Sequence, residues 1–513
     1  MSIRRPNIPE LDAIATRFGL SVAATDMEQY LAASHVALEA WDVVEEAHAE
    51  ISAPVPERAW NRPTVDDDPF GAWYVRTEIQ ERTDGPLSGM RVAVKDNTSV
   101  AGVPMMNGSL TLEGFTPSRD ATVVTRLLQA GAVIAGKSVC EDLCMSGGSH
   151  TSKPAPVHNP WDVSRSSGGS SSGSGVLVAT GEVDLAISGD QGGSIRVPAS
   201  WLGLVGHKPT WGLVPYTGAM PVEQSIDHLG PTARSVLDAA RMLTVLAGPD
   251  GLDPRQPRDM TSVDFAAELG RGSHGLRVGV LLEGFGRPGS DAAVDEAVRT
   301  AAHRLEAAGL VVGDVSVPWH LRAPALFAVI AYEGGVAQLV EGNAFGSSWK
   351  GHYDEDLIDF YGRQWRRSPD AFPASVIMTM LAGRYARDTG HGRHYAMARN
   401  LERSLAAAYD EALSRFDVLV MPTVPTTATP LPSADASVLE VLALGSDPLL
   451  NTSAFNITGH PACSVPVGLV DGLPAGMMIV GRQFDDATVL RVAQAVEDQL
   501  GDSPRPPVTQ ETT

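Results

Sequence analysis

Cysteine is scarce in this chain of 513 residues, which contains only three: Cys140, Cys144 and Cys463. Three thiols cannot make the disulfide framework of a small secreted domain, and the C-x3-C pair has no second pair or histidine cluster nearby that would suggest zinc. We therefore expect buried free thiols and no structural metal.

Basic residues are also few, with 39 Lys and Arg against 61 Asp and Glu, a formal net charge of −22. Proteins that bind phosphate backbones use clustered Lys and Arg, so we expect no nucleic-acid partner. No run reaches the roughly 18 apolar residues of a membrane span. The opening stretch MSIRRPNIPELDAIATRFG lacks the continuous apolar segment of a secretory signal. We expect a cytoplasmic protein with no membrane partner.

The first part of the chain, residues 1–84, is expected to be an N-terminal α-helical region. Within it, the segment DMEQYLAASHVALEAWDVVEEAHAE mixes apolar and acidic residues as one long amphipathic helix would, with Asp26 as its N-cap. A Pro- and Asp-rich connector follows. This helix either packs on its own chain or contacts a second copy of it. The more specific prediction is that this helical region is a dimerisation element and that the protein is a homodimer.

Residues 85–500 alternate short apolar strands with helices, which predicts an α/β fold with a large mixed, mostly parallel sheet covered by helices on both faces. Residues 320–410 are more helical, and residues 501–513 should be a loose tail. The clearest strands and helices are MRVAV, ATVVTRLLQAG, AVIAGKS, LRVGVL, DAAVDEAVRTAAHRLEAAG, LVVGDVSV and FDVLVMPTVP, followed by two apolar strands and a last helix.

The most informative stretch runs from Ser164 to Arg196, SRSSGGSSSGSGVLVATGEVDLAISGDQGGSIR. A flexible linker stays polar throughout, whereas VLVATG and VDLAIS need a core to bury them. Glycines that punctuate buried segments mark turns or close backbone approach. The two Gly-rich loops are therefore predicted to belong to a site.

Three side chains carry the chemistry. Lys95 directly follows the buried run VAV, and burial disfavours a charged ammonium, so the amine can serve as a base. The alternative is a lysine paired with Asp96 at the end of the strand. Ser170 follows two glycines in GGSS, and its hydroxyl can pass a proton because it both donates and accepts. Ser194 ends GDQGGS, where the glycines free backbone N–H groups to hold an oxyanion.

Together these motifs resemble the amidase signature family. The resemblance covers roughly residues 85–500 and is carried by VAVKDN, AGVPMMNGS, DATVVTRLLQAGAVIAGK, the GGSS loop, GDQGGSIRVPAS, GLVGHKPTWGLVPYTG and FNITGHPACSVPVG. The bacterial nitrile-pathway and enantioselective amidases are the most similar in appearance. The resemblance implies the α/β/α sandwich of that family, with Ser194 as nucleophile, Ser170 as a bridging serine after a cis peptide bond with Gly169, and Lys95 as base.

The resemblance also implies how the rest of the site is arranged. The N–H groups of Gln191, Gly192, Gly193 and Ser194 would form the oxyanion hole, and no metal or organic cofactor is required. Three further residues would brace the loops: Ser171, Asp190 and Arg196. The acyl pocket would be lined by Met145, Gln191, Ile226 and Phe327, although Phe327 can equally be ordinary core. The chain departs from the family where Ser172 and Gly175 replace common Gly and Ala, and where Gln191 replaces Thr or Ile.

Other motifs are weaker. Gly169, Ser171 and Gly173 satisfy G-x-S-x-G, but that nucleophile elbow needs a strand immediately before it, and HNPWDVSRSS is polar. Ser347–Lys350 satisfies S-x-x-K without the partner motifs. Asp227 and His228 are candidates for the acid and the base of a Ser-His-Asp triad, whereas the resemblance places this pair in a structural turn near the site. No Gly-rich stretch ends in G-K-[ST], which excludes a P-loop.

The sequence thus predicts an amidase that hydrolyses a small aliphatic or aryl carboxamide through an acyl-enzyme on Ser194, giving a carboxylate and ammonia or an amine. Aryl acylamidase, esterase and carbamate hydrolase activities share the same relay and stay open. An amidotransferase subunit is a further alternative, against which the strong acidity weighs. A binding protein that has lost catalysis is disfavoured because Lys95, Ser170 and Ser194 are all present.

Overall fold

The computed structural model describes residues 3–51, 54–501 and 505–507. The chain divides into two compact units, Met1–Pro56 and Glu57–Thr513. The boundary expected at residue 84 therefore lies inside the second unit. Of the predicted tail 501–513, the positions 502–504 and 508–513 lie outside the described residues.

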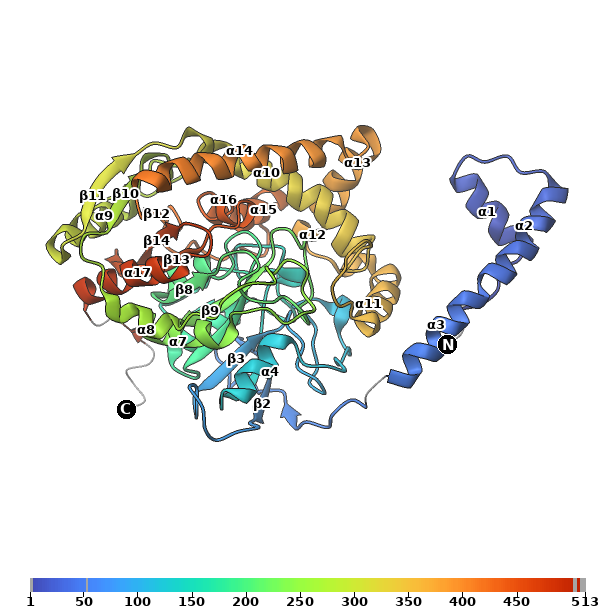
Figure 1. Ribbon diagram of the computed structural model, residues 1–513, viewed down its shortest axis with the longest axis horizontal. Coiled ribbons are helices and arrows are strands. Elements are labelled where there is room, and N and C mark those ends of the chain that lie inside the picture. The colour runs from blue at the N-terminus through green and yellow to red at the C-terminus, as the bar shows by residue number, and fades with distance from the viewer. Residues whose placement is uncertain (1–2, 52–53, 502–504, 508–513) are drawn as a thin grey trace. The chain divides into compact units, whose positions relative to one another are not determined.

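Within the described residues, the N-terminal unit contains three helices, α1 (Ile8–Arg17), α2 (Ala24–Ala37) and α3 (Glu39–Ile51) (Figure 1). The single long helix predicted here is wrong, because the chain turns at Leu38 between α2 and α3, and α2 starts before Asp26. Contacts distant in sequence accompany this turn: Pro6 O bonds His35 Nε2 at 2.9 Å, and Arg5 pairs with Asp42 at 2.5 Å. The spacing of apolar residues, from which the single helix was predicted, gives no information about contacts between residues this far apart in the sequence.

The second unit is built on one sheet of twelve strands in the order β1-β2-β4-β3-β7-β9-β8-β13-β14-β12-β10-β11. The strands are β1 (Trp60–Asn61), β2 (Trp73–Ile79), β3 (Arg91–Lys95), β4 (Val133–Ser138), β7 (Leu185–Asp190), β8 (Val205–Lys208), β9 (His228–Ala233), β10 (Arg277–Leu281), β11 (Val311–Val315), β12 (Val418–Pro422), β13 (Ala462–Val470) and β14 (Leu473–Gly481). The short strands β5 (His158–Asn159) and β6 (Asp162–Ser166) form a separate pair.

The mixed sheet is confirmed, but it is less parallel than predicted. Parallel pairing occurs where β3 lies between β4 and β7, and where β10 lies between β11 and β12. The remaining neighbours are antiparallel, among them the adjacent strands β13 and β14. Alternation of strands and helices in the sequence does not reveal which strands pair across the sheet, and this is where the prediction failed.

Helices cover the sheet because their apolar residues recur on one side. In α4 (Thr122–Gln129), the buried residues are Val123, Val124, Leu127 and Leu128, as expected for an amphipathic helix. The other main helices of the sheet region are α5 (Ser172–Thr180), α6 (Arg196–Leu202), α7 (Val236–Leu246), α8 (Phe265–Glu268), α9 (Ala292–Arg304), α16 (Ala454–Ile457) and α17 (Asp486–Leu500).

The helical region expected between residues 320 and 410 is confirmed. It contains α10 (Ala323–Val329), α11 (Glu355–Arg367), α12 (Ala374–Met378), α13 (Arg384–Gly390) and α14 (Arg393–Arg415), and α14 lies against α10 (Figure 1). Between α10 and α11, residues Ile330–Gly334 and Val336–Val340 are π-helical, and Thr379–Gly383 after α12 is a third such turn. Turns of this kind are frequent at functional sites.

By length and composition, the helical stretch Pro318–Val340 is apolar enough to cross a membrane. More than half of its most apolar part, 56%, is buried inside the protein. Its α10 portion packs on α14 and α16, as a core helix does. The stretch also carries Phe327, which lies at the cavity described below.

Candidate active site

Lys95 ends the buried strand β3, and its side chain is fully buried. Its Nζ donates a hydrogen bond of 2.8 Å to Ser170 Oγ and a longer one of 3.4 Å to Gly189 O. The alternative pairing with Asp96 is wrong, because the Asp96 carboxylate accepts from Lys137 Nζ at 2.8 Å. Lys137 therefore compensates the buried carboxylate, and Lys95 is left to face the serine.

Ser170 lies in the loop that leads into α5, and the peptide bond between Gly169 and Ser170 is cis, as expected. The loop is packed so tightly that a Cβ atom at Gly169 would lie 1.8 Å from Gly148 O. The Gly169 N–H donates to Gly147 O at 2.8 Å, and Ser170 O accepts from Glu141 N at 3.1 Å. These contacts position the Ser170 hydroxyl at the end of β3.

Ser194 lies between the end of β7 and the start of α6, and it is 4% exposed. Within the described part of the chain, Ser194 Oγ has no hydrogen-bond partner, and the backbone N–H groups of residues 191–194 donate to no other group. A loop with four unused donors and a free hydroxyl can receive a carbonyl group and the negative charge that forms on it. Gly193 has a φ of 154°, which only glycine adopts readily.

An ion pair inside the protein braces this loop. Arg196 donates to both oxygens of Asp190, with Nε and Nη2 each at 3.0 Å, and both side chains are fully buried. Burial alone would raise the pKa of Asp190, but the Arg196 guanidinium outweighs it and holds that pKa below its usual value. Ser171 Oγ donates to Gly189 O at 3.0 Å. The three predicted bracing residues therefore all contact the loop or the strand that precedes it.

Asn456 completes the brace, and the sequence pattern had not singled it out. Its amide nitrogen donates to Asp190 O at 2.9 Å, and its oxygen accepts from Arg196 Nη2 at 2.6 Å. Asn456 lies in the FNITGHP motif that contributed to the family resemblance. That motif was the available signal, although nothing in its spacing indicated a partner some 260 residues earlier.

A cavity of about 310 Å³ lies next to Ser194, and all four predicted pocket residues line it: Met145, Gln191, Ile226 and Phe327. Phe327 is thus not ordinary core. Most other lining residues come from elements after residue 320, and the apolar ones among them include Ala328, Ala331, Tyr332, Val441, Leu442, Leu449 and Leu450. They were missed because an apolar residue on a helix looks the same whether it faces a cavity or the core.

The three cysteines are free and buried, as predicted. Cys144 also lines the cavity, and the thiols of Cys140 and Cys144 both donate to Asn107 Oδ1 at 3.3 Å. Leu143 and Cys144 have positive φ values of 48° and 61°, which are uncommon for residues with a side chain. Among the described residues, no three His, Cys, Asp or Glu side chains are grouped as a metal ion requires.

The competing motifs do not form sites. Asp227 accepts from the backbone N–H groups of Val222 and Glu223, while His228 Nδ1 contacts Ile226 O at 2.8 Å, so the aspartate does not orient the imidazole. Burial and the nearby Lys208 lower the pKa of His228. Asp227 follows the turn at residues 224–226, and His228 begins β9, so the pair lies at the junction of this turn with the strand and not inside the turn that the resemblance implied. The strand before Ser171 belongs to the small β5–β6 pair, and Ser347 and Lys350 are exposed.

Comparison with known proteins identifies the family of this chain. The family model described as Amidase matches residues 71–490. An enantioselective amidase from Rhodococcus rhodochrous is 50% identical over 511 residues, which cover 99% of this chain and 98% of that protein. Among solved structures, a glutamyl-tRNA(Gln) amidotransferase subunit from Thermotoga maritima has a TM-score of 0.72 and 30% identity, covering 86% of this chain and 91% of its own.

The native peptide amidase from Stenotrophomonas maltophilia is a further solved relative, with a TM-score of 0.66 and 31% identity over 82% of this chain and 85% of its own. The family match spans nearly the whole second unit, and the Rhodococcus relative spans the first unit as well. The chain therefore belongs to the amidase signature family and is an amide hydrolase.

Proposed function

We propose that Ser194 is the nucleophile of this amidase, with Ser170 as the proton bridge and Lys95 as the base. The observation that carries the proposal is the 2.8 Å hydrogen bond from Lys95 Nζ to Ser170 Oγ. Lys95 Nζ also donates to Gly189 O, on the strand that leads into the loop of Ser194, whose hydroxyl has no partner in the described chain. Lys95 takes a proton through Ser170 from Ser194, and Ser194 Oγ attacks the amide carbonyl.

The charge that develops on the carbonyl oxygen is held by the N–H groups of Gln191, Gly192, Gly193 and Ser194. In support, these groups donate no hydrogen bond elsewhere in the described chain. The relay then returns the proton to the leaving amine. Water attacks the acyl-enzyme by the same route and releases the carboxylate, and none of these steps needs a metal or an organic cofactor.

The acyl group of the substrate is proposed to be small and either aliphatic or aryl, with ammonia or an amine as the second product. The support is the size of the cavity, about 310 Å³, and its mostly apolar wall, both of which suit a small organic ligand. The names of the Rhodococcus relative, an enantioselective amidase, and of the Stenotrophomonas relative, a peptide amidase, both support an amide substrate. Anilides, esters and carbamates share the proposed relay and also belong in the substrate panel.

The test compares Ser194→Ala with Ser200→Ala. Ser200 is a buried serine on α6 whose hydroxyl has no partner among the described residues, so it controls for loss of a buried hydroxyl. Ser194→Ala should abolish hydrolysis of every amide in the panel and labelling by a fluorophosphonate probe, while both variants melt close to the wild-type temperature. Retained turnover in Ser194→Ala would remove the assigned nucleophile.

A second candidate function is that of an amidotransferase component, favoured by the likeness to the Thermotoga protein. Such a protein delivers its ammonia to a partner, whereas an independent amidase does not. Turnover of simple amides by the isolated chain, without partner protein, tRNA or ATP, would decide for the amidase. The formal charge of −22 also disfavours a surface for tRNA.

We further propose that the protein is a cytoplasmic homodimer whose N-terminal unit mediates dimerisation. The unit exposes large apolar side chains, among them Phe18 at 76% and Val44 at 68%, and such surfaces commonly mark protein contacts. Three reduced, buried thiols suit a reducing compartment. Light scattering should give a dimer for the wild type and a monomer for the double variant Phe18→Asp, Val44→Asp; a monomeric wild type would contradict the proposal.

A further inference from the structure

The side chain of Gln191 is held from behind by a tyrosine. Gln191 Nε2 donates to Tyr216 OH at 2.9 Å, and the Tyr216 phenol is enclosed by protein. Asn97 Nδ2 donates to the same oxygen at 3.3 Å, and the phenol donates its own proton to Met220 O at 3.4 Å. Burial raises the pKa of Tyr216, so the phenol keeps that proton at any pH of interest.

These contacts decide which end of the Gln191 amide faces the cavity. A phenol has one proton to donate and two lone pairs with which to accept. Its proton goes to Met220 O, so towards Gln191 it can only accept. The NH2 group of Gln191 must therefore point at Tyr216, and its Oε1 must point away. A flipped amide would take the single proton of the phenol away from Met220 O and leave that carbonyl without its donor, so the observed orientation is the one that pairs every group.

Gln191 Oε1 is buried, has no hydrogen-bond partner within the described chain, and belongs to a residue that is 3% exposed and lines the cavity. Other cavity residues also have unpaired buried polar atoms, namely His150, Ser375 and Ser453. Only Gln191 belongs to the loop that carries Ser194. A Cβ atom placed on Gly189 would meet Gln191 Nε2 at 3.4 Å and Lys95 Nζ at 3.5 Å, which puts the amide beside the relay.

We propose that Tyr216 makes the enzyme selective for amides over esters, by fixing Gln191 so that its carbonyl oxygen accepts a hydrogen bond from the N–H of the scissile amide. The inference rests on the proposed role of Ser194, because it places the leaving group of the substrate next to that loop. An ester has no N–H, and its leaving oxygen would face an acceptor. A site built to pair an N–H discriminates strongly against the analogue without one.

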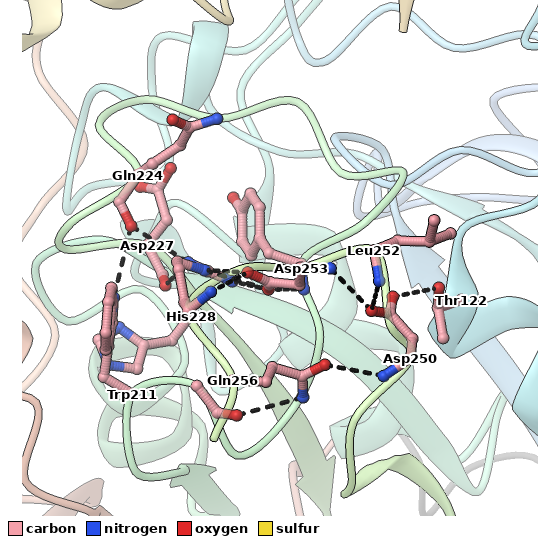
Figure 2. A network of polar contacts seen from close by, with 12 residues as sticks. Thr122, Trp211, Gln224, Asp227, His228, Asp250, Leu252, Asp253 and Gln256 are labelled. Carbon is pink, nitrogen blue, oxygen red and sulfur yellow. Dashed lines mark hydrogen bonds and ion pairs between the residues drawn. The ribbon is translucent and has the colours of Figure 1, made fainter. Parts of the chain in front are cut away.

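Tyr216 is itself fixed by the segment of residues 248–256, in which Asp253, Arg255 and Gln256 are buried. The backbone N–H of Tyr216 donates to Asp253 at 2.9 Å, and the Arg255 guanidinium lies 5.0 Å from the centre of the Tyr216 ring. Figure 2 shows how this segment is tied together, with Asp250 contacting Thr122 and Leu252, and Gln256 contacting Asp250. Arg255 also donates to Asp227 O at 2.9 Å, which joins the segment to the turn beside the cavity.

The experiment uses Tyr216→Phe in the full chain and two substrates that share one acyl group, benzamide and 4-nitrophenyl benzoate. The matched control is Tyr361→Phe, another buried tyrosine, on α11, whose hydroxyl has no partner among the described residues. In Tyr216→Phe, kcat/KM for benzamide should fall roughly ten- to a hundredfold, because the Gln191 amide is free to flip. For the ester it should change less than about threefold. Tyr361→Phe should leave the ratio of kcat/KM for benzamide to kcat/KM for the ester unchanged.

An equal fall for both substrates, or no change for either, would overturn the inference, because a merely structural tyrosine does not distinguish them. If Tyr216→Phe fails to fold, Gln191→Met keeps the length of the side chain without the acceptor and must lower the amide-to-ester ratio by a similar factor. The proposed function is tested separately by fluorophosphonate labelling of the wild type at Ser194. If the wild type is labelled at Ser194 but the amide-to-ester ratio of kcat/KM is unchanged in Tyr216→Phe, only the role of Tyr216 is rejected, and the proposed function stands.

Discussion

Gly192 offers a sharp test of how the acyl pocket is built. A Cβ atom at this position would lie 2.6 Å from Cζ and 3.2 Å from Cε2 of Phe327, and 3.3 Å from Leu449 Cδ1. Gly192 is not among the glycines with positive φ, so an alanine meets no backbone obstacle. The substitution Gly192→Ala therefore acts through contacts between the loop of residues 191–194 and the wall of the cavity, of which the contact with Phe327 is the shortest.

The size of the effect follows from that distance. Carbon atoms in contact normally lie about 3.5–4.0 Å apart, so the Phe327 ring or the loop must move by roughly 1 Å. A displacement of this size near reacting groups costs about a hundredfold in rate. We expect kcat/KM for an aryl amide to fall by that factor. An acetamide-sized substrate, which needs less of the cavity, should lose less than about tenfold.

The assay measures kcat/KM for benzamide and acetamide in Gly192→Ala, in Phe327→Leu and in the double variant. Shortening Phe327 removes the obstacle, so the double variant should recover most of the loss caused by Gly192→Ala. Gly270→Ala is the matched control, because a Cβ atom there would meet nothing within 4 Å. Wild-type activity in Gly192→Ala, or no recovery in the double variant, would refute this account of the pocket.

Three further changes have definite expected results. Arg196→Met leaves the Asp190 carboxylate buried without its ion-pair partner, so the free energy of unfolding measured with urea should fall by about 3–5 kcal/mol. Arg277→Met removes an exposed partner of Asp417 and should lower the free energy of unfolding far less, because water solvates and screens that pair. Burial lowers the pKa of His320 to about 4. In the unfolded chain the histidine has its ordinary pKa of about 6.5, so between about pH 4 and pH 6.5 the unfolded chain binds more protons than the folded one. The free energy of unfolding should therefore fall by up to about 3 kcal/mol as the pH is lowered through this range. In His320→Gln, the free energy of unfolding measured with urea should depend less on pH over the same range. Lys95→Met should abolish acylation at every pH, measured as the burst of amine release, and rescue at high pH would contradict its role as base.

The sequence alone determined most of the elements and singled out the groups that we propose to react. Strand β3 lies where a continuous apolar run predicted it, and helix α4 lies where helical periodicity predicted it. A strand buried on both faces is apolar throughout, and a helix buried on one face has apolar residues at helical spacing, so both patterns can be seen in the local sequence. Lys95, Ser170 and Ser194 were found because each stands at a sharp local feature, the end of a buried run or a pair of glycines. Such features need no knowledge of distant partners.

Only the tertiary structure decided which groups meet. That Asp96 pairs with Lys137, that the chain breaks at Leu38, and that most neighbouring strands are antiparallel all depend on contacts between segments far apart in the sequence. The orientation of Gln191 is the clearest case, since it is set by the hydrogen-bonding capacity of Tyr216, 25 residues away. A sequence specifies what each side chain can donate or accept, whereas the fold selects the partner that satisfies it.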